Sequence, residues 1–409
     1  MRFTLRLYNF KKKFVVLSKN FQLLKIRIML EKINHFPINW IDGMKINKSH
    51  LLALQDYFAD VYRDSVGSRI TPISYGLLPN EDHESARIYI NQDNHNLLTV
   101  RVEECHAVTS NGTRIEINPV TELSEKILPE TIYTLQNSGE TVLWITIVVS
   151  LFEKLPFGKI NAEENPPRYP FLMPAYKIVL IKDGEKSVYP QGYQLTIGKI
   201  LVGKDSAHLQ ENYIPPCTAV QSHKTLITAY SEFDRFLGQI EQSAVQIVQK
   251  INQKQQSNNL AVMIGQMCEL IMSYLGNEIN SLRWFGLYEP PAFMLDKIAR
   301  LARIIKNFVD VRVGAGKEEL LNYLAEWCGL SQGDFEILFS EVVNAGYNHN
   351  EIGLTLKKSA TFIKTLEGLF ATLSKLDYIG KRNDTGIFIK ERQENDPTKK
   401  IKRSIFFDD

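Results

Sequence analysis

The chain has 409 residues, of which 44% are hydrophobic and 23% charged, a composition typical of a soluble globular protein with room for two or three domains. It excludes a wholly disordered chain, because such chains carry too few apolar residues to build a core. The net charge of +2 combines a basic stretch over residues 1–28, with eight Lys or Arg residues and no acid, and a mildly acidic remainder, which argues against a general nucleic-acid binder.

Three explanations compete for the basic N-terminal stretch. A secretory signal needs an apolar core of roughly 7–15 residues, and Lys19 and Lys25 interrupt the apolar runs here. A helix on a membrane surface would need a stronger apolar face. We therefore favour a basic extension over residues 1–37, in part untranslated if Met29 is the true first residue. No apolar run is long enough to predict a transmembrane helix.

A turn and a helix are the first elements predicted along the chain. Asp42-Gly43 is a strong turn signal, and it lies within Trp40-Ile41-Asp42-Gly43-Met44. Apolar residues then recur at helical spacing from 49 to 61. Ser49 is the expected N-cap of that helix.

Residues from about 70 to 220 have the pattern of an antiparallel β structure. The expected strands are 86–90, 98–102, 114–117, 142–151, 176–181 and 194–202. Asn111-Gly112 predicts a hairpin turn, and the apolar run 142–151 predicts a strand buried on both faces. The proline-rich stretch 161–174 is expected to be a surface loop. Many short strands between turns favour a sandwich or a barrel, so we assign 38–220 to a β-rich domain built as an antiparallel sandwich.

After Pro215-Pro216 the apolar period changes from that of strands to that of a coiled-coil seam. The seam positions are Leu226, Tyr230, Phe233, Leu237, Ile240, Ala244, Ile247 and Ile251. A polar break at 253–259 and a second helix from 260 to 282 predict an antiparallel hairpin, so 221–288 forms a helical neck. Further helices are expected over 289–375, which makes the fold class α+β.

The residue types that commonly act in catalysis or bind metal ions form no recognisable catalytic or metal-binding motif in this sequence. Gly314-Ala315-Gly316-Lys317 is similar to a phosphate loop, but Glu318 stands where that loop needs Ser or Thr. The histidines include no pair at zinc-binding spacing, and the neighbours Cys105 and His106 point to opposite faces of a strand. The four cysteines form no C-x-x-C pair, as in a reduced compartment.

From this absence of motifs we expect no enzyme activity, cofactor, metal ion, nucleic acid or small-molecule substrate. An enzyme with an unrecognised site is the alternative that the sequence leaves open.

Three landmarks, in chain order, resemble the TssK family of type VI secretion system baseplate subunits. The first landmark is similar to the family's opening, which reads W-x-[ED]-G-M and then a P-Q-H-F-Q-like segment. Here it consists of Trp40-x-Asp42-Gly43-Met44, followed by Ser49-His50-Leu51 and Gln55-Asp56. Lys48-Ser49 stands in place of Pro-Gln, and Leu51 in place of Phe. The second landmark resembles the strand and the F-I-P-P-C ending that precede the family's helices. It consists of Ile197-Gly198-Lys199-Ile200, followed by Tyr213-Ile214-Pro215-Pro216-Cys217. The third, Tyr347-Asn348-His349-Asn350-Glu351, resembles its Y-x-H-x-[DE] segment.

The resemblance implies a structural subunit of a homotrimer. The β-rich domain would be a shell that binds the baseplate wedge, which TssF and TssG form in the family. The implied wedge-contact residues are Trp40, Asp42, Gly43, Met44, His50 and Gln55. The helices would form the neck and the trimer interface along the seam named above. The protein would be cytoplasmic, at a baseplate docked on the inner membrane, and linked directly or indirectly to the membrane complex.

The tail departs from the family, whose chains usually continue into a β-rich head domain. Here residues 376–409 are a short tail, expected to form at most a β-hairpin in place of that head. A phage-tail-like receptor-binding or attachment subunit of similar architecture is the alternative function.

Overall fold

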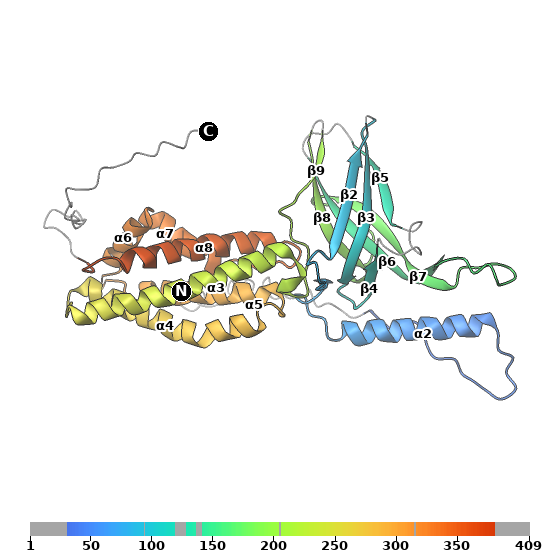
Figure 1. Cartoon of the computed structure of the whole chain (residues 1–409), viewed down its shortest axis with the longest axis horizontal. Coiled ribbons are helices and arrows are strands. Elements are labelled where there is room, and N and C mark those ends of the chain that lie inside the picture. The colour runs from blue at the N-terminus through green and yellow to red at the C-terminus, as the bar shows by residue number, and fades with distance from the viewer. Residues whose placement is uncertain are drawn as a thin grey trace, which may run out of the picture.

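The computed structural model describes residues 31–93, 95–118, 128–135, 141–203, 206–314 and 316–380. In chain order it contains a long helix, two antiparallel sheets and a bundle of helices (Figure 1). The α+β fold class predicted from the sequence is therefore confirmed. Two segments lie outside the described residues: 1–30, which includes Met29, and 381–409 in the tail.

Helix α2 (Lys48–Gly67) is the predicted first helix, and its N-cap lies two residues earlier than expected. The Asn47 side chain accepts hydrogen bonds from the backbone N–H groups of Ser49 and His50. Asn47, not Ser49, is therefore the N-cap, because it supplies the acceptor that the first helical donors lack. Figure 1 shows α2 beneath the sheets, apart from the helical bundle.

The first sheet is built around one long strand, β3 (Leu97–Val108). One side of β3 pairs with β1 (Gly76–Leu77) and β2 (Ala86–Gln92), and the other side with β4 (Arg114–Ile117) and β5 (Glu130–Thr134), all antiparallel. The predicted turn joins β3 to β4: Gly112 has a φ of +94°, and Thr109 N–H donates to Thr113 O at 2.9 Å.

The second sheet has the strand order β7-β6-β8-β9, again antiparallel. Its strands are β6 (Thr141–Phe157), β7 (Phe171–Lys182), β8 (Gln194–Val202) and β9 (Ala207–Leu209), and the short 3-10 helix η1 (Gln191–Tyr193) leads into β8. Central strand β6 is buried on both faces from Ile145 to Val149, as its apolar run predicts.

Strands β6 and β7 continue beyond the end of β8 as a two-stranded arm, which projects from the sandwich in Figure 1. The last pair of the arm is Phe157 with Phe171. The predicted loop over 161–174 is therefore wrong for residues 171–174, which are strand. Pro156 and Pro174 fit there because, beyond the end of β8, each strand has one unpaired edge that needs no N–H donor.

The two sheets share one buried core. Leu98 and Val100 of β3 and Ile145 and Ile147 of β6 are all fully buried within it. Where β2 meets β9, Gln92 Oε1 accepts a hydrogen bond from Ala207 N–H at 2.9 Å. This arrangement is the sandwich that the alternating strands predict.

The remaining chain is helical. The helices are α3 (Lys224–Gln253), α4 (Asn259–Phe285), α5 (Pro291–Asp310), α6 (Lys317–Cys328), α7 (Gln332–Val343) and α8 (Ile352–Leu373), preceded by the 3-10 helix η2 (Val220–Ser222). Helices α3 and α4 form the predicted antiparallel hairpin, and Asn258 caps α4 by accepting from Ala261 N–H at 2.8 Å.

Helix α3 lies at the centre of the helical bundle, against both α4 and α8. Helix α5 packs on α4, α7 and α8. Within the described ranges, no helix combines the length and the apolar character that crossing a membrane requires.

Candidate functional site

The second and third sequence landmarks meet where the strands join the helices. His349 Nε2 lies 2.7 Å from the Tyr75 carbonyl oxygen, and His349 Nδ1 lies 2.7 Å from the Tyr347 hydroxyl. Because a carbonyl only accepts, Nε2 carries the proton, and Nδ1 accepts from the Tyr347 hydroxyl. A neutral imidazole therefore joins the start of the first sheet to the loop before α8.

Asn350 adds two hydrogen bonds to the same junction. The Tyr213 hydroxyl donates to the Asn350 carbonyl oxygen at 3.1 Å, and the Tyr75 hydroxyl donates to Asn350 Oδ1 at 3.1 Å. Tyr213 belongs to the second landmark and Asn350 to the third. Segments 137 residues apart in the sequence are thus in direct contact.

Burial keeps this junction uncharged. His349 is 4% exposed, and burial lowers its pKa to about 4, although the hydrogen bond to the Tyr75 carbonyl opposes the shift. Burial also raises the pKa of the Tyr213 and Tyr347 hydroxyls. Both nitrogens of His349 are engaged, so the imidazole is not available as a general base.

A cleft of about 820 Å³ opens beside the junction. Its lining includes Trp144 and Gln194 of the second sheet together with His349 and Asn350. Gln194 Oε1 is buried and lacks a hydrogen-bond partner within the described residues. The lining mixes aromatic and polar side chains, and both ring nitrogens of its one imidazole already have hydrogen-bond partners.

Close backbone approach at Gly76 fixes the same junction. Leu77 N–H donates to Pro216 O at 2.7 Å, and Thr218 N–H donates to Leu77 O at 2.9 Å. Gly76 has a φ of +116°, and a Cβ there would lie 2.0 Å from Pro216 O. Only glycine fits this position, so the Pro-Pro segment and the first sheet come together through a residue without a side chain.

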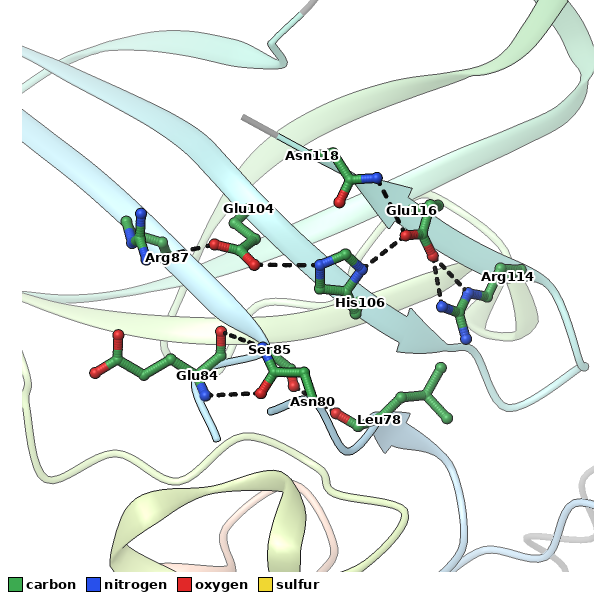
Figure 2. A network of polar contacts seen from close by, with 10 residues as sticks. All are labelled: Leu78, Asn80, Glu84, Ser85, Arg87, Glu104, His106, Arg114, Glu116 and Asn118. Atoms are coloured by element: carbon green, nitrogen blue, oxygen red, sulfur yellow. Dashed lines mark hydrogen bonds and ion pairs between the residues drawn. The ribbon is translucent and has the colours of Figure 1, made fainter. Parts of the chain in front are cut away.

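A network of ion pairs lies on the exposed face of the first sheet near the junction. Figure 2 shows His106 between two acids, with Nε2 3.2 Å from Glu104 and Nδ1 2.8 Å from Glu116. Arg87 pairs with Glu104 at 3.4 Å, and Arg114 pairs with Glu116. Every acid has a basic partner and both ring nitrogens are used, so the cluster is an ion-pair network that links strands.

Two contacts tie this sheet edge to the first neck helix. Glu84 pairs with Lys224 at the start of α3, and His83 Nδ1 lies 2.9 Å from the Gln221 carbonyl oxygen in η2. The Lys224 hydrogen bond lowers the pKa of the Glu84 carboxyl. The strands and the helices are therefore connected through charged as well as neutral groups.

The predicted wedge-contact residues lie before α2 and in its first two turns, and most of them are exposed. Trp40 is 46% exposed and meets the His50 ring edge-on at 6.1 Å between centroids. Asp42 and Gly43 are exposed in the predicted turn, where Gly43 has a φ of +78° and Met44 N–H donates to Ile41 O at 3.2 Å. Met44 is half-buried, and Gln55 lies exposed farther along α2. Their contact with a wedge stays a prediction.

A buried carboxylate ties the start of the described chain to the middle of α2. Asp60 Oδ2 accepts from the backbone N–H groups of Asn34 and His35 at 2.7 and 3.1 Å, and Asp60 Oδ1 accepts from Arg63 Nε at 2.9 Å. Arg63 also donates to the Glu31 carbonyl oxygen at 3.1 Å. Residues 31–35 are thereby held against α2.

The predicted seam is buried within a single chain. All of its positions except Tyr230 are 8% exposed or less, and the Tyr230 hydroxyl donates to Arg283 O at 3.3 Å. The helices that contact α3 are α4 and α8 of the same chain. The seam thus lies in the core of the helical bundle, and its part in a trimer stays a prediction.

The glycines at 314 and 316 lie before α6, with φ of +75° and +94°. Lys317, which a phosphate loop would direct at phosphate, instead contacts Asp310 at 2.8 Å and Glu336 at 3.6 Å. Among the described residues, no group of three His, Cys, Asp or Glu side chains is placed to hold a metal ion.

Burial raises the pKa of the thiols of Cys105, Cys217 and Cys268. All three are buried and unpaired with other cysteines. A buried thiol with a raised pKa is a poor nucleophile, so these side chains serve as small apolar residues in the core.

Sequence reasoning missed Tyr75, Gly76, Asp60 and Arg63. An isolated glycine directly before an apolar pair is a signal for close backbone approach. Asp60 and Arg63 stand three residues apart, on the side of α2 away from its largest apolar residues. That inverted pattern was visible in the sequence, but a helix is normally assumed to bury its apolar side.

No protein-family model matches this sequence, and none of the curated proteins matches it significantly. Three solved structures that contain TssK are similar to it. A crystal structure of TssK is 13% identical, with 82% of this chain and 70% of that chain covered and a TM-score of 0.48. TssK from T6SS EAEC, in complex with a nanobody, is 15% identical over 78% and 68% of the two chains, with a TM-score of 0.45. A chain of the type VI secretion system TssK-TssF-TssG baseplate subcomplex is 12% identical over 81% and 99%, with a TM-score of 0.45.

Proposed function

We propose that this chain is a structural subunit of a type VI secretion baseplate, of the TssK kind. It acts as a homotrimer, binds a TssF/TssG-like wedge through its β-rich shell and connects the baseplate toward the membrane complex. The observation that carries the proposal is the contact between the second and third landmarks, in which the Tyr213 hydroxyl donates a hydrogen bond to the Asn350 carbonyl oxygen. These residues carry the resemblance, and they also hold the helices against the strands.

The proposed mechanism is mechanical. The shell comprises 38–220, the neck 221–288 and the following helical region 289–375. A buried neck transmits position because close-packed interiors deform little. Three identical shells around one axis would bind the wedge more firmly than one, since linked contacts raise the effective concentration of each. The work requires no bond-making step, so the proposed role is not that of an enzyme.

The proposed location is the cytoplasmic side of the inner membrane, at the docked baseplate. It follows from the proposed partners. A receptor-binding subunit of a phage-like tail would instead be displayed outward, and its partner would be a surface receptor or glycan.

Wedge capture tests the proposal. The tagged chain is co-expressed with TssF- and TssG-like proteins, and the complex is purified by the tag. We expect Trp40→Ala to weaken capture at least about tenfold, because an exposed tryptophan at an interface commonly contributes roughly 2 kcal/mol or more. Trp284, which is 66% exposed at the end of α4, gives the matched control, and Trp284→Ala should change capture less than about twofold.

Equal capture by wild type and Trp40→Ala would remove the first landmark from the wedge surface. Failure of the wild-type chain to capture either wedge protein would contradict the proposed function itself.

A further inference from the structure

Five charged side chains form a row across three paired strands of the first sheet (Figure 2). The row, here called the charge row, runs from Arg87 on β2 through Glu104 and His106 on β3 to Glu116 and Arg114 on β4. Base and acid therefore alternate along its whole length. His106 stands at its centre, and histidine is the base that can gain or lose a proton near neutral pH.

Contacts within the charge row indicate how many protons the His106 ring carries. Its Nδ1 lies 2.8 Å from Glu116 Oε1, and its Nε2 lies 3.2 Å from Glu104 Oε1. An ionised carboxylate only accepts hydrogen bonds, so both ring nitrogens must donate, which only the charged imidazolium can do. A neutral ring would turn one nitrogen lone pair toward a carboxylate, and that contact would be repulsive.

The acid on the β4 side of His106 is ionised. Burial by itself raises the pKa of the Glu116 carboxyl, but the hydrogen bond and the charge of Arg114 outweigh burial and hold the pKa below its usual value. Asn118 Nδ2 also donates to Glu116 Oε1, at 3.3 Å. The proton between Glu116 and His106 therefore belongs to the imidazole, and a rise in pH removes it from there.

The neighbouring titratable groups keep their charge near neutral pH. The Tyr176 hydroxyl of β7 accepts from Glu116 N–H at 3.2 Å, and burial raises the pKa of that hydroxyl. Burial likewise raises the pKa of the Cys105 thiol, on the opposite face of β3. In the loop before β2, Glu84 pairs with Lys224, whose hydrogen bond lowers the pKa of the Glu84 carboxyl.

Strand β4 connects the charge row to helix α2. It has only four residues, so few backbone hydrogen bonds hold it on β3. The hairpin turn between the two strands lies directly against the C-terminal end of α2, because a Cβ on Gly112 would lie 2.3 Å from Arg63 O and 2.4 Å from Gly67 N. A looser β4 therefore loosens the support of this end of the helix.

We propose that the proton on His106 controls how firmly β4 pairs with β3 and, through the hairpin turn, how firmly the C-terminal end of α2 is held. With the proton, alternating charges link β2, β3 and β4. Without it, one of the two contacts of the ring becomes repulsive, and the charge row divides into its outer pairs, Arg87 with Glu104 and Arg114 with Glu116. This control would operate whatever the chain binds.

The direction of the pH dependence follows from the charge of the ring. The contacts of His106 with both acids exist only in the folded chain and only with the charged ring. The stability that they contribute is therefore present at low pH and is lost as the pH rises past about 6.5, where imidazole usually titrates. His349 has the opposite sign, because burial disfavours its charged form and lowers its pKa to about 4.

Hydrogen–deuterium exchange of the purified full chain tests this control. It is measured at about pH 6 and about pH 8, which bracket the usual titration of imidazole, with exchange times corrected for the intrinsic effect of pH. We expect the amides of β4 and of residues 63–67 to lose protection about fivefold or more at the higher pH, the size of the loss of one charge-assisted hydrogen bond. The amides from Ile145 to Val149, at the centre of β6, should keep theirs.

Two variants assign the effect to the ring. His106→Gln carries no charge at either pH, so it should show the lower protection under both conditions. Glu104→Gln, whose side-chain amide can donate to an uncharged ring, should reduce the pH difference. His95→Gln is the matched control, since His95 is an exposed histidine between β2 and β3 of the same sheet; it should keep the full difference.

Equal protection of β4 at the two pH values in wild type would overturn the proposal without any variant. A full pH difference in His106→Gln would also overturn it, because the titrating group would then lie elsewhere. Circular dichroism at both pH values verifies that each variant folds. None of these outcomes depends on whether the chain binds a wedge.

Discussion

Asp60 shows how one side chain can determine the position of a whole helix. Burial by itself raises the pKa of the Asp60 carboxyl, but hydrogen bonds from Asn34 N–H, Arg63 and His35 N–H outweigh it and hold the pKa below its usual value. The carboxylate is therefore the stable form in the folded chain. It links the segment before α2 to the middle of the helix.

Asp60→Asn should lower the free energy of unfolding by about 3–5 kcal/mol, because the buried Arg63 guanidinium would lose its charged partner. Urea unfolding measures the change. Asp64→Asn, at an acid of the same helix with a side chain 34% exposed, should change stability by less than about 0.5 kcal/mol. Because the folded pKa of Asp60 is depressed, its contribution is complete above about pH 4 and is lost as the pH falls further. Equal stability of the two variants would contradict this role.

His349 predicts a pH dependence in a different window. Burial lowers its pKa to about 4 in the folded chain, whereas an exposed histidine titrates near about 6.5. The unfolded chain then binds more protons between these two values, so stability falls as the pH drops through this range, by roughly 3 kcal/mol in total. His349→Gln should be less stable at pH 7 and should lack this part of the slope. An unchanged slope in urea titrations across the window would exclude His349 as its source.

At the scale of elements, the contact between β1 and the Pro-Pro segment depends on a missing side chain. Gly76→Ala places a Cβ where Pro216 O already lies, at 2.0 Å, so one of the two segments must move. Gly184 also has a positive φ, +81°, but nothing lies within 4 Å of a Cβ there. We expect Gly184→Ala to cost about 1 kcal/mol and Gly76→Ala clearly more, measured by thermal unfolding. Similar losses would mean that only backbone conformation matters.

The seam on α3 predicts a stability effect without a change of mass. Leu237 is 3% exposed, and Leu237→Ala should lower the free energy of unfolding by about 2–5 kcal/mol through the cavity it leaves. Val245→Ala, on the same helix at 38% exposure, should cost less than about 1 kcal/mol. Light scattering should give the same number of copies for both variants and wild type. Dissociation by Leu237→Ala with little loss of stability would assign the seam to the trimer interface.

Local patterns predicted the elements better than they predicted their partners. The buried run of β6, the Asn111-Gly112 hairpin and the α3–α4 hairpin follow from residues within each segment. The strand at 171–174 was missed because the prolines of the stretch 161–174 predicted a loop. Its pairing partner β6 lies outside that stretch and so left no signal in it. The two sides of α2 are visible in the sequence, but which of them is buried depends on contacts with Asn34, His35 and Gly112, which lie outside the helix. Contacts between distant segments decide what local periodicity leaves open.

At the scale of the whole molecule, the strands and the helices are joined by contacts of several kinds. A neutral hydrogen bond joins His349 to Tyr75, an ion pair joins Glu84 to Lys224, and close backbone contact at Gly76 fixes the Pro-Pro segment that leads into the helices. Such a junction resists both bending and separation. That property suits a subunit whose proposed work is to hold a wedge at a fixed position relative to a membrane.

The most direct test of a trimeric baseplate subunit is the number of copies of this chain in its complex with the wedge proteins, measured by native mass spectrometry after co-expression. We expect the chain, at 46.9 kDa per copy, to be present in multiples of three, bound to TssF- and TssG-like partners. A single copy in the complex, or no complex with the wedge at all, would contradict that role.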